Sequence, residues 1–149
     1  MININKYKIK LYKSLFNNYK NIFCIKRKKF IIYSEEELLR QKILLFLINK
    51  KKYKLYNIKI EKKIFLNYNK YYKIDILVNN NILIECKSPK FKINKINFYQ
   101  LFKYSNFLKI NYLFLTNGIE NIIFKINLLN NKIKYVKDIP NNINKHIFY

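Results

Sequence analysis

The chain has one glycine, one histidine, two cysteines and no tryptophan among its 149 residues. Cys24 and Cys86 give no disulfide framework and no zinc-ligand spacing. The lone histidine, His146, has no evident partner, which makes a Cys–His nucleophilic pair a remote alternative. With a single glycine, the chain also has no Gly-x-x-x-x-Gly-Lys-Ser/Thr phosphate loop, so we expect no ATP-driven motor in it.

Long hydrophobic runs are missing as well. The longest, residues 43–48, is far too short to span a bilayer. The first residues are polar and basic and contain no apolar segment of a cleavable signal. We therefore expect a cytoplasmic protein with no membrane partner.

Acidic residues are scarce: 8 Asp and Glu stand against 31 Lys and Arg, which gives a formal net charge of +23. Such a charge attracts polyanions. However, Lys, Asn, Ile, Tyr and Phe dominate while alanine is absent, which is typical of a very AT-rich genome, so the charge is compatible with nucleic-acid binding without demonstrating it. A length of 149 residues, half of them apolar, predicts one domain with a proper core.

The most informative stretch is residues 72–87. Two apolar, β-branched runs, 72–78 and 82–87, flank Asn79–Asn81, and asparagines tolerate the positive φ that tight turns need. Alternation puts Asp75 and Leu77 on one face of the first strand, opposite Ile74, Ile76 and Val78. It also puts Glu85 and Lys87 on one face of the second strand, opposite Ile84 and Cys86.

The length of the turn decides whether the two acids meet. A three-residue loop opposes Val78 with Ile82 and Asp75 with Glu85, with Cβ atoms about 4.5–5.5 Å apart. A two-residue loop would place the carboxylates on opposite faces unless a bulge restored the phase. We predict the three-residue register or a bulged equivalent, which would bring together two carboxylates able to hold one divalent cation.

Hydrophobic periodicity, together with the residues that favour turns and helix caps, predicts the other elements. Strands are expected at 7–12, 21–25, 29–33, 54–66, 111–115, 121–127 and 132–136, and helices at 34–50 and 94–108. The implied domains are an N-terminal β flap (1–33), a core (34–140) and a loose tail (141–149). Strand 111–115 follows the second helix, which predicts parallel pairing with strand 82–87.

Ser34 and Glu37 have the spacing of a capping box at the start of the first helix. We expect Leu39, Ile43, Phe46 and Leu47 to form that helix's buried stripe. In the second helix, Phe98, Leu101, Phe102, Ser105 and Leu108 should face the sheet, while Gln100 and Tyr104 lie one turn apart on one face. Gly118 is expected at a backbone conformation that other residues cannot adopt. Arg27, Lys28 and Lys29 are either phosphate contacts or a solvated turn.

These residues carry a resemblance. Asp75, followed after nine residues by Glu85-Cys86-Lys87, resembles the Asp…(Asp/Glu)-x-Lys core of the restriction-endonuclease-like PD-(D/E)xK nuclease superfamily. Residues 23–41, Ile84–Pro89, Gln100-x-x-x-Tyr104 and Thr116-Asn117-Gly118 follow in the order shown by the N-terminal nuclease domain of type I restriction enzyme R subunits. The resemblance covers nearly the whole chain.

The resemblance implies an α/β (α+β) fold: an αβββαβ core whose mixed sheet is flanked by two helices, with an N-terminal β flap and a C-terminal hairpin. It implies metal-dependent DNA hydrolysis, with Asp75, Glu85 and Lys87 catalytic. Mg²⁺ or Mn²⁺ would be held by Asp75, Glu85 and the Cys86 carbonyl, together with Glu36 as the candidate from the first helix; Glu35, Glu37 and Glu61 stay open for that last role. The substrate contacts implied are Gln100, Tyr104, Lys73 and Lys90.

Two other interpretations remain. A catalytically inactive, basic nucleic-acid-binding module would keep the same fold, and a structural protein would owe its charge to base composition alone. Glu61 is either an auxiliary ligand or an edge-strand charge. The sequence leaves open the DNA target, endonuclease or exonuclease action and the oligomeric state, a dimer being one option.

Overall fold

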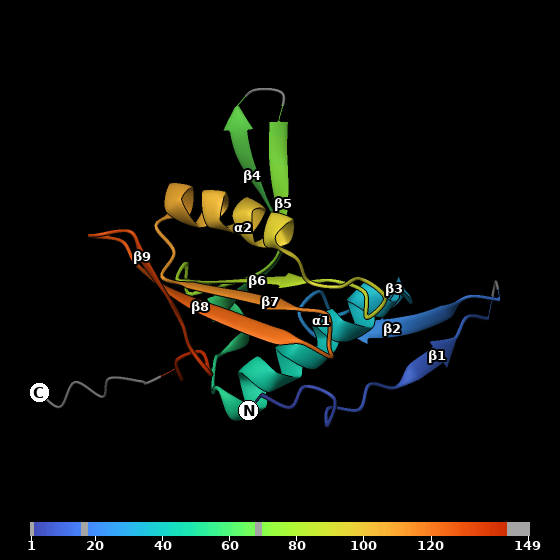
Figure 1. Ribbon diagram of the computed structural model, residues 1–149. Coiled ribbons are helices and arrows are strands. Elements are labelled where there is room, and N and C mark those ends of the chain that lie inside the picture. Colours follow the sequence, from blue (N-terminus) through green and yellow to red (C-terminus); the bar gives the residue numbers. More distant parts are fainter. Residues whose placement is uncertain (1, 16–17, 68–69, 143–149) are drawn as a thin grey trace, which may run out of the picture.

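The computed structural model of the chain describes residues 2–15, 18–67 and 70–142. Within them lie two sheets (Figure 1). The first holds β1 (Leu11–Lys13), β2 (Lys20–Cys24) and β3 (Lys29–Ile32). The second holds, in spatial order, β4 (Ile58–Asn67), β5 (Lys70–Val78), β6 (Ile82–Cys86), β7 (Tyr112–Thr116), β8 (Asn121–Asn127) and β9 (Lys132–Tyr135).

The helices are α1 (Glu35–Leu45), continued by the π-helical turn η1 (Phe46–Lys50), a short 3₁₀ turn η2 (Leu55–Asn57) and α2 (Lys95–Leu108). All strand pairs of the larger sheet are antiparallel except β6 and β7, which are parallel and connected through α2. The order α1-β4-β5-β6-α2-β7 is the predicted αβββαβ core, and the fold class is α+β.

The two helices cover opposite faces of the larger sheet. Leu39 and Ile43 of α1 and Leu47 of η1 pack on Ile82, Ile84 and Cys86 of β6, whereas Leu101 of α2 packs on Leu83 and Leu113. Neighbouring residues of β6 thus enter different cores, as a strand buried on both faces requires. The predicted stripe of α1 is buried; Leu101 and Ser105 of α2 are buried, and Phe98, Phe102 and Leu108 are half-buried against the sheet.

The β5–β6 hairpin has the predicted three-residue turn. Val78 pairs with Ile82 and Ile76 with Ile84, and Asn79 and Asn80 both have φ of +51°. One detail of the prediction was wrong: Ile74 packs with Leu77 on the α2 face, not with Ile76 and Val78. The strand therefore loses its alternation between Ile74 and Leu77, which is where Asp75 lies.

The first helix begins at the predicted cap, and the second begins at a cap that the sequence analysis did not name. The Ser34 side chain accepts from the Glu37 amide at 3.0 Å, and Asn94 accepts from the Asn97 amide at 3.0 Å. The carboxylate of Glu37, however, does not complete the predicted capping box. It accepts instead from Arg40 and Gln41 in the interior, because an arginine one turn along the buried face offers a charged donor.

Strands β4 and β5 form an arm that extends well beyond the rest of the larger sheet (Figure 1). Strand β4 begins later than the predicted strand 54–66, because residues 55–57 form the 3₁₀ turn η2. Ile64 and Tyr72, which pair across the arm, face α2. Glu61, on the edge strand β4, has φ of +48°, at the level where the Glu61–Asp75 pair is missing from the ladder.

Gly118 has φ of +86°, as expected of a residue that needs left-handed backbone. The C-terminal hairpin β8–β9 forms as predicted. Beyond it, Asp138 pairs with Lys51, and the Asn142 amide donates to the Lys51 carbonyl at 2.8 Å. Thus residues 141–142 are attached to the core, while 143–149, including His146, lie outside the described residues. The domain boundaries stay a prediction.

In the described ranges, the helices are too short or too polar to cross a membrane.

Candidate functional site

The candidate site lies where β5 separates from β6. The ladder between them ends at Ile76 and Ile84, one residue before Asp75 and Glu85 would oppose each other. In place of a strand partner, the Cys86 amide donates to Asp75 Oδ2 at 2.8 Å. The carboxylate of Asp75 therefore lies in the fork between the strands, and the three-residue turn fixes its position beside Glu85.

Glu85 is buried, with 7% of its surface exposed. Lys87 Nζ donates to its Oε1 at 2.7 Å and the Tyr72 hydroxyl donates to its Oε2 at 2.8 Å. Burial, followed by the negative charge of Asp75, raises the pKa of the Glu85 carboxyl above its ordinary value. The charge of Asp75 thus opposes the ionisation of Glu85, and a cation between the two carboxylates would relieve that cost.

Lys87 follows β6 directly and is half-buried. Burial by itself would lower the pKa of its ammonium, but the charge of Glu85, its hydrogen bond to Lys87 and the charge of Asp75 together outweigh burial and raise that pKa. Lys87 is therefore a fixed cation and hydrogen-bond donor rather than a proton acceptor. Tyr72 is also a donor: burial and then the charge of Glu85 raise the pKa of its hydroxyl.

Arg40 is a central residue of the site that the sequence analysis missed. It lies on the buried face of α1, 6% exposed, and its guanidinium donates to Glu37 and, at 2.7 Å, to Asp75 Oδ1. Burial opposes the charge, but Asp75 and then Glu37 raise the pKa of Arg40. The sequence does contain a signal for it: the chain has only two arginines, Arg27 and Arg40, among its 31 basic residues.

The other arginine joins the same network. Arg27 Nη2 lies 2.5 Å from Glu61 Oε2 and 3.8 Å from Glu37, so Arg27 is neither solvated nor free for phosphate. Glu61 also pairs with Lys73. Although burial would raise the pKa of Glu61, its bonds to Lys73 and the charge of Arg27 lower it. Glu61 thus holds cations of the flap and the arm, an ion-pairing role on the edge strand.

The predicted helix carboxylate, Glu36, is exposed and lies near Lys87. Both line a pocket of about 270 Å³ at the end of β6, together with Phe91, Lys92, Asn94 and Asn97. Of the other two glutamates, Glu35 accepts from Ser88 and Glu37 from Arg40. The choice of Glu36 over its neighbours therefore stays a prediction that the pocket supports.

The four predicted substrate contacts are scattered. Lys73 is half-exposed on the arm, and Lys90 is 81% exposed, 3.6 Å from Glu35. Gln100 is exposed on α2. Tyr104 stacks on Tyr72 with ring centroids 3.8 Å apart. Because the Tyr72 hydroxyl donates to Glu85, Tyr104 supports the site indirectly, by packing on Tyr72.

The donor set fits a hard divalent cation. Asp75, Glu85 and the Cys86 carbonyl are oxygen ligands of the kind that Mg²⁺ prefers. Each of the four carboxylate oxygens accepts one hydrogen bond, which leaves each a further lone pair. Groups of three or more Asp, Glu, Cys or His side chains that could hold a metal are absent from the described residues, so a third protein ligand would have to be a backbone carbonyl or a carboxylate that moves.

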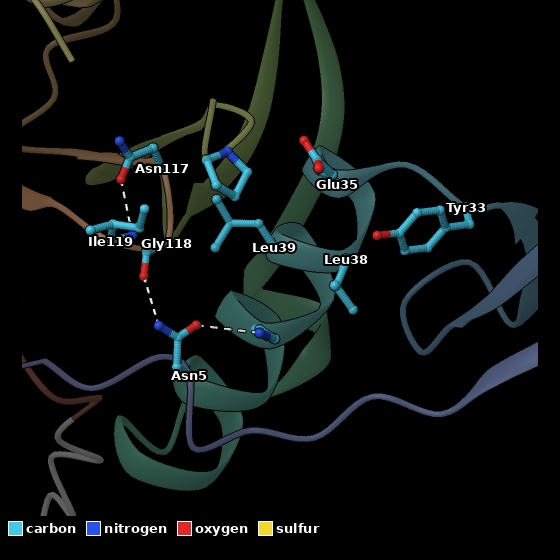
Figure 2. Close-up of a pocket in the computed structure, with 10 residues that line it drawn as sticks. Asn5, Tyr33, Glu35, Leu38, Leu39, Asn117, Gly118 and Ile119 are labelled. Atoms are coloured by element: carbon cyan, nitrogen blue, oxygen red, sulfur yellow. Dashed lines mark hydrogen bonds between the residues drawn. The ribbon is translucent and has the colours of Figure 1, made fainter. Parts of the chain in front are cut away.

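A separate pocket of about 250 Å³ lies between the start of α1 and the Asn117–Gly118 turn (Figure 2). There the Asn5 amide donates to the Gly118 carbonyl at 3.0 Å. Asp75, Glu85 and Lys87 do not line this pocket, and it brings together no pair of carboxylates. We assign no chemistry to it.

The fold and the site together define the class of this protein. It is an α+β domain with an αβββαβ core, in which Asp75, the Glu85-x-Lys87 pair and the buried Arg40 meet at the fork of the central hairpin. The chain belongs to the family described as the type I restriction enzyme R protein N terminus, whose family model matches residues 35–140. Neither the curated proteins nor the solved structures contain a match to this chain.

Proposed function

We propose that the chain is a metal-dependent deoxyribonuclease that hydrolyses phosphodiester bonds. The observation that carries the proposal is the meeting of Asp75, Glu85 and Lys87 at one fork. Membership of a restriction enzyme family suggests DNA as the partner, and the net charge of +23 favours a polyanion.

Asp75, Glu85 and the Cys86 carbonyl would hold Mg²⁺ or Mn²⁺, with Glu36 as a further candidate. A divalent cation supplies Lewis-acid chemistry at a phosphate and acidifies water. Lys87, kept protonated by Glu85, would donate to a phosphate oxygen or orient the attacking water, and would offset the negative charge that develops during attack. Tyr72 and Arg40 would hold the two carboxylates in place.

A second candidate function is DNA binding without catalysis. One observation favours it: the charges of the site are already compensated, Asp75 by Arg40 and Glu85 by Lys87. A cation would have to coexist with these partners or displace them. In this case the ion-paired cluster would serve the fold, and the basic surface would bind DNA.

Cleavage of supercoiled plasmid and of single-stranded DNA, with Mg²⁺ or Mn²⁺ and with EDTA, separates the two functions. We expect metal-dependent cleavage by the wild type and none by Lys87→Ala or Asp75→Asn. Lys87→Ala is the cleaner variant, because that side chain is 31% exposed, whereas Asp75→Asn puts an amide against Arg40 and the Cys86 amide.

Lys134→Ala, on the opposite edge strand β9, is the matched control and should cleave as the wild type does. Undiminished cleavage by Lys87→Ala would refute the assignment of the site. If the wild type binds DNA but does not cut it with either metal, the binding function takes its place.

A further inference from the structure

The β4–β5 arm carries a surface that lies outside the fork of Asp75, Glu85 and Lys87. On its face away from α2, Lys63 pairs directly with Lys73, and Phe65 pairs directly with Tyr71. All four side chains are exposed; Phe65 is 64% and Tyr71 51% exposed. We call these four residues the arm face.

Phe65 and Tyr71 are open to water although a neighbour of each along its strand is covered. On the other side of the same strands, Ile64 and Tyr72 are covered by α2. The rings of Phe65 and Tyr71 lie 5.9 Å apart, tilted by 53°, and the Lys63 ammonium lies 4.5 Å from the centre of the Tyr71 ring. The arm face therefore combines a pair of flat apolar surfaces with two cations.

The arm face leads to the candidate site. Tyr71, Lys73 and Asp75 lie at alternate positions of β5, about 6.6 Å per step, so Tyr71 is about 13 Å from Asp75 along the strand. Lys73 pairs with Glu61, which lies 3.8 Å from Arg40, and Arg40 bonds to Asp75. A step of this length is similar to the spacing of nucleotides in an extended strand.

We propose that the arm face binds single-stranded nucleic acid next to the candidate site: unpaired bases stack on Phe65 and Tyr71 while Lys63 contacts a phosphate, Lys73 being paired with Glu61. Stacked aromatic rings next to cations are what strand binding without sequence preference requires. A duplex would keep its bases away from both rings. The inference rests on the proposed DNA substrate but not on cleavage.

Two other surfaces share part of this arrangement. Lys125 and Lys134 pair directly on β8 and β9, so opposed lysines by themselves indicate little in this chain. Phe23 and Phe30 form an exposed aromatic pair on β2 and β3, with rings 5.3 Å apart. Tyr12 extends this pair, 5.0 Å from Phe30, and Lys10 lies 5.1 Å from the centre of the Tyr12 ring. This face belongs to the smaller sheet, which carries neither Asp75 nor Glu85. These two pairs serve as matched controls.

The test is the affinity of the full chain for a fluorescein-labelled oligothymidylate, measured by anisotropy in EDTA so that nothing is cut. Phe65→Ala with Tyr71→Ala should weaken binding by about 5-fold to 150-fold for each base that loses its ring, whereas Phe23→Ala with Phe30→Ala should change the affinity by less than about 2-fold. Phe65→Tyr with Tyr71→Phe, which keeps both rings, should bind like the wild type. Lys63→Ala should make the slope of log K against log salt less steep by about 0.7.

The inference would be overturned if the arm variant and the Phe23/Phe30 variant lost affinity equally. It would also be overturned if the wild type bound duplex and single-stranded DNA with equal affinity. A dimer, seen by sedimentation, that disappears in the arm variant while its affinity for the oligonucleotide stays unchanged would overturn it too, because the face would then bind a second copy. If the wild type binds no nucleic acid, the proposed function fails too; if it binds through the arm but never cuts, only the nuclease proposal fails.

Discussion

At the scale of single residues, the site depends on Arg40 as much as on its carboxylates. Arg40 is the cation that compensates both Glu37 and Asp75. Removing one partner of a buried ion pair costs more than the pair contributes, because the remaining charge is left unpaired. This makes Arg40 a residue whose loss should be measurable without any assay of activity.

We therefore predict that Arg40→Met lowers the free energy of unfolding by about 3 to 5 kcal/mol, measured by urea denaturation. Arg40→Lys should also be costly, since an ammonium cannot reproduce the two-pronged geometry of a guanidinium. Arg27→Met is the control: its side chain is 19% exposed against 8% for Arg40, so it should cost less. A loss no larger in Arg40→Met than in Arg27→Met would contradict the buried role.

Gly118 makes a second residue-scale prediction. Gly118→Ala should destabilise the protein by about 1 to 2 kcal/mol, because φ of +86° is unfavourable for a residue with a Cβ. The new Cβ would lie 3.4 Å from Leu39 Cδ1, an ordinary contact, so backbone strain dominates. Gly118→Asn should cost less, since asparagine tolerates left-handed backbone. Equal losses in a thermal melt would point to packing instead.

Residue types alone predicted part of the site. The scarcity of acids drew attention to Asp75 and Glu85, and the hairpin turn brought them to one fork because asparagines permit its positive φ. Arg40 and Tyr72 were missed because a polar residue on a buried stripe has no visible partner until the strands are placed. The side chain of Glu37 was misassigned for a different reason: its partner, Arg40, lies on the next turn of the same helix and was itself overlooked.

At the scale of elements, the stack of Tyr104 on Tyr72 joins α2 to the arm, beside the packing of Ile64 against the same helix. We predict that Tyr104→Ala lowers the free energy of unfolding by about 0.5 to 1.5 kcal/mol beyond the loss from apolar burial. Tyr104→Phe keeps the ring and should therefore keep most of this stabilisation. If Tyr104 instead contacts substrate through its hydroxyl, as the sequence resemblance implies, Tyr104→Phe would impair DNA binding while leaving the unfolding curve unchanged.

The elements themselves were predictable where local chemistry determines them. The Ser34 cap placed the start of α1, apolar periodicity placed α2, and period-2 patterning placed β5 and β6. The pattern failed between Ile74 and Leu77, because there β5 stops pairing with β6 and twists away with β4. Its residues then follow the arm rather than the sheet, and no periodicity in the sequence marks such a departure.

At the scale of the whole molecule, the net charge sets two opposite responses to salt. A formal charge of +23 repels itself in the folded state, and salt screens that repulsion. The ion pairs around Arg40 and Glu85 are buried and are screened much less. Folding should therefore become more favourable with salt, while DNA binding, which releases counterions, should become weaker.

We predict that sodium chloride raises the thermal midpoint of unfolding by a few degrees, since a stabilisation of about 1 kcal/mol corresponds to roughly 2–8 °C. DNA affinity should fall steeply over the same range of salt concentration. Lys132→Glu with Lys134→Glu on the exposed strand β9 lowers the net charge without touching the site, so it should raise the midpoint at low salt and reduce the salt effect. A midpoint that falls with salt would mean that ion pairs, not repulsion, dominate the electrostatics of this fold. In that case the basic surface is balanced locally, and DNA binding would have to depend on specific contacts such as those of the arm face rather than on the overall field.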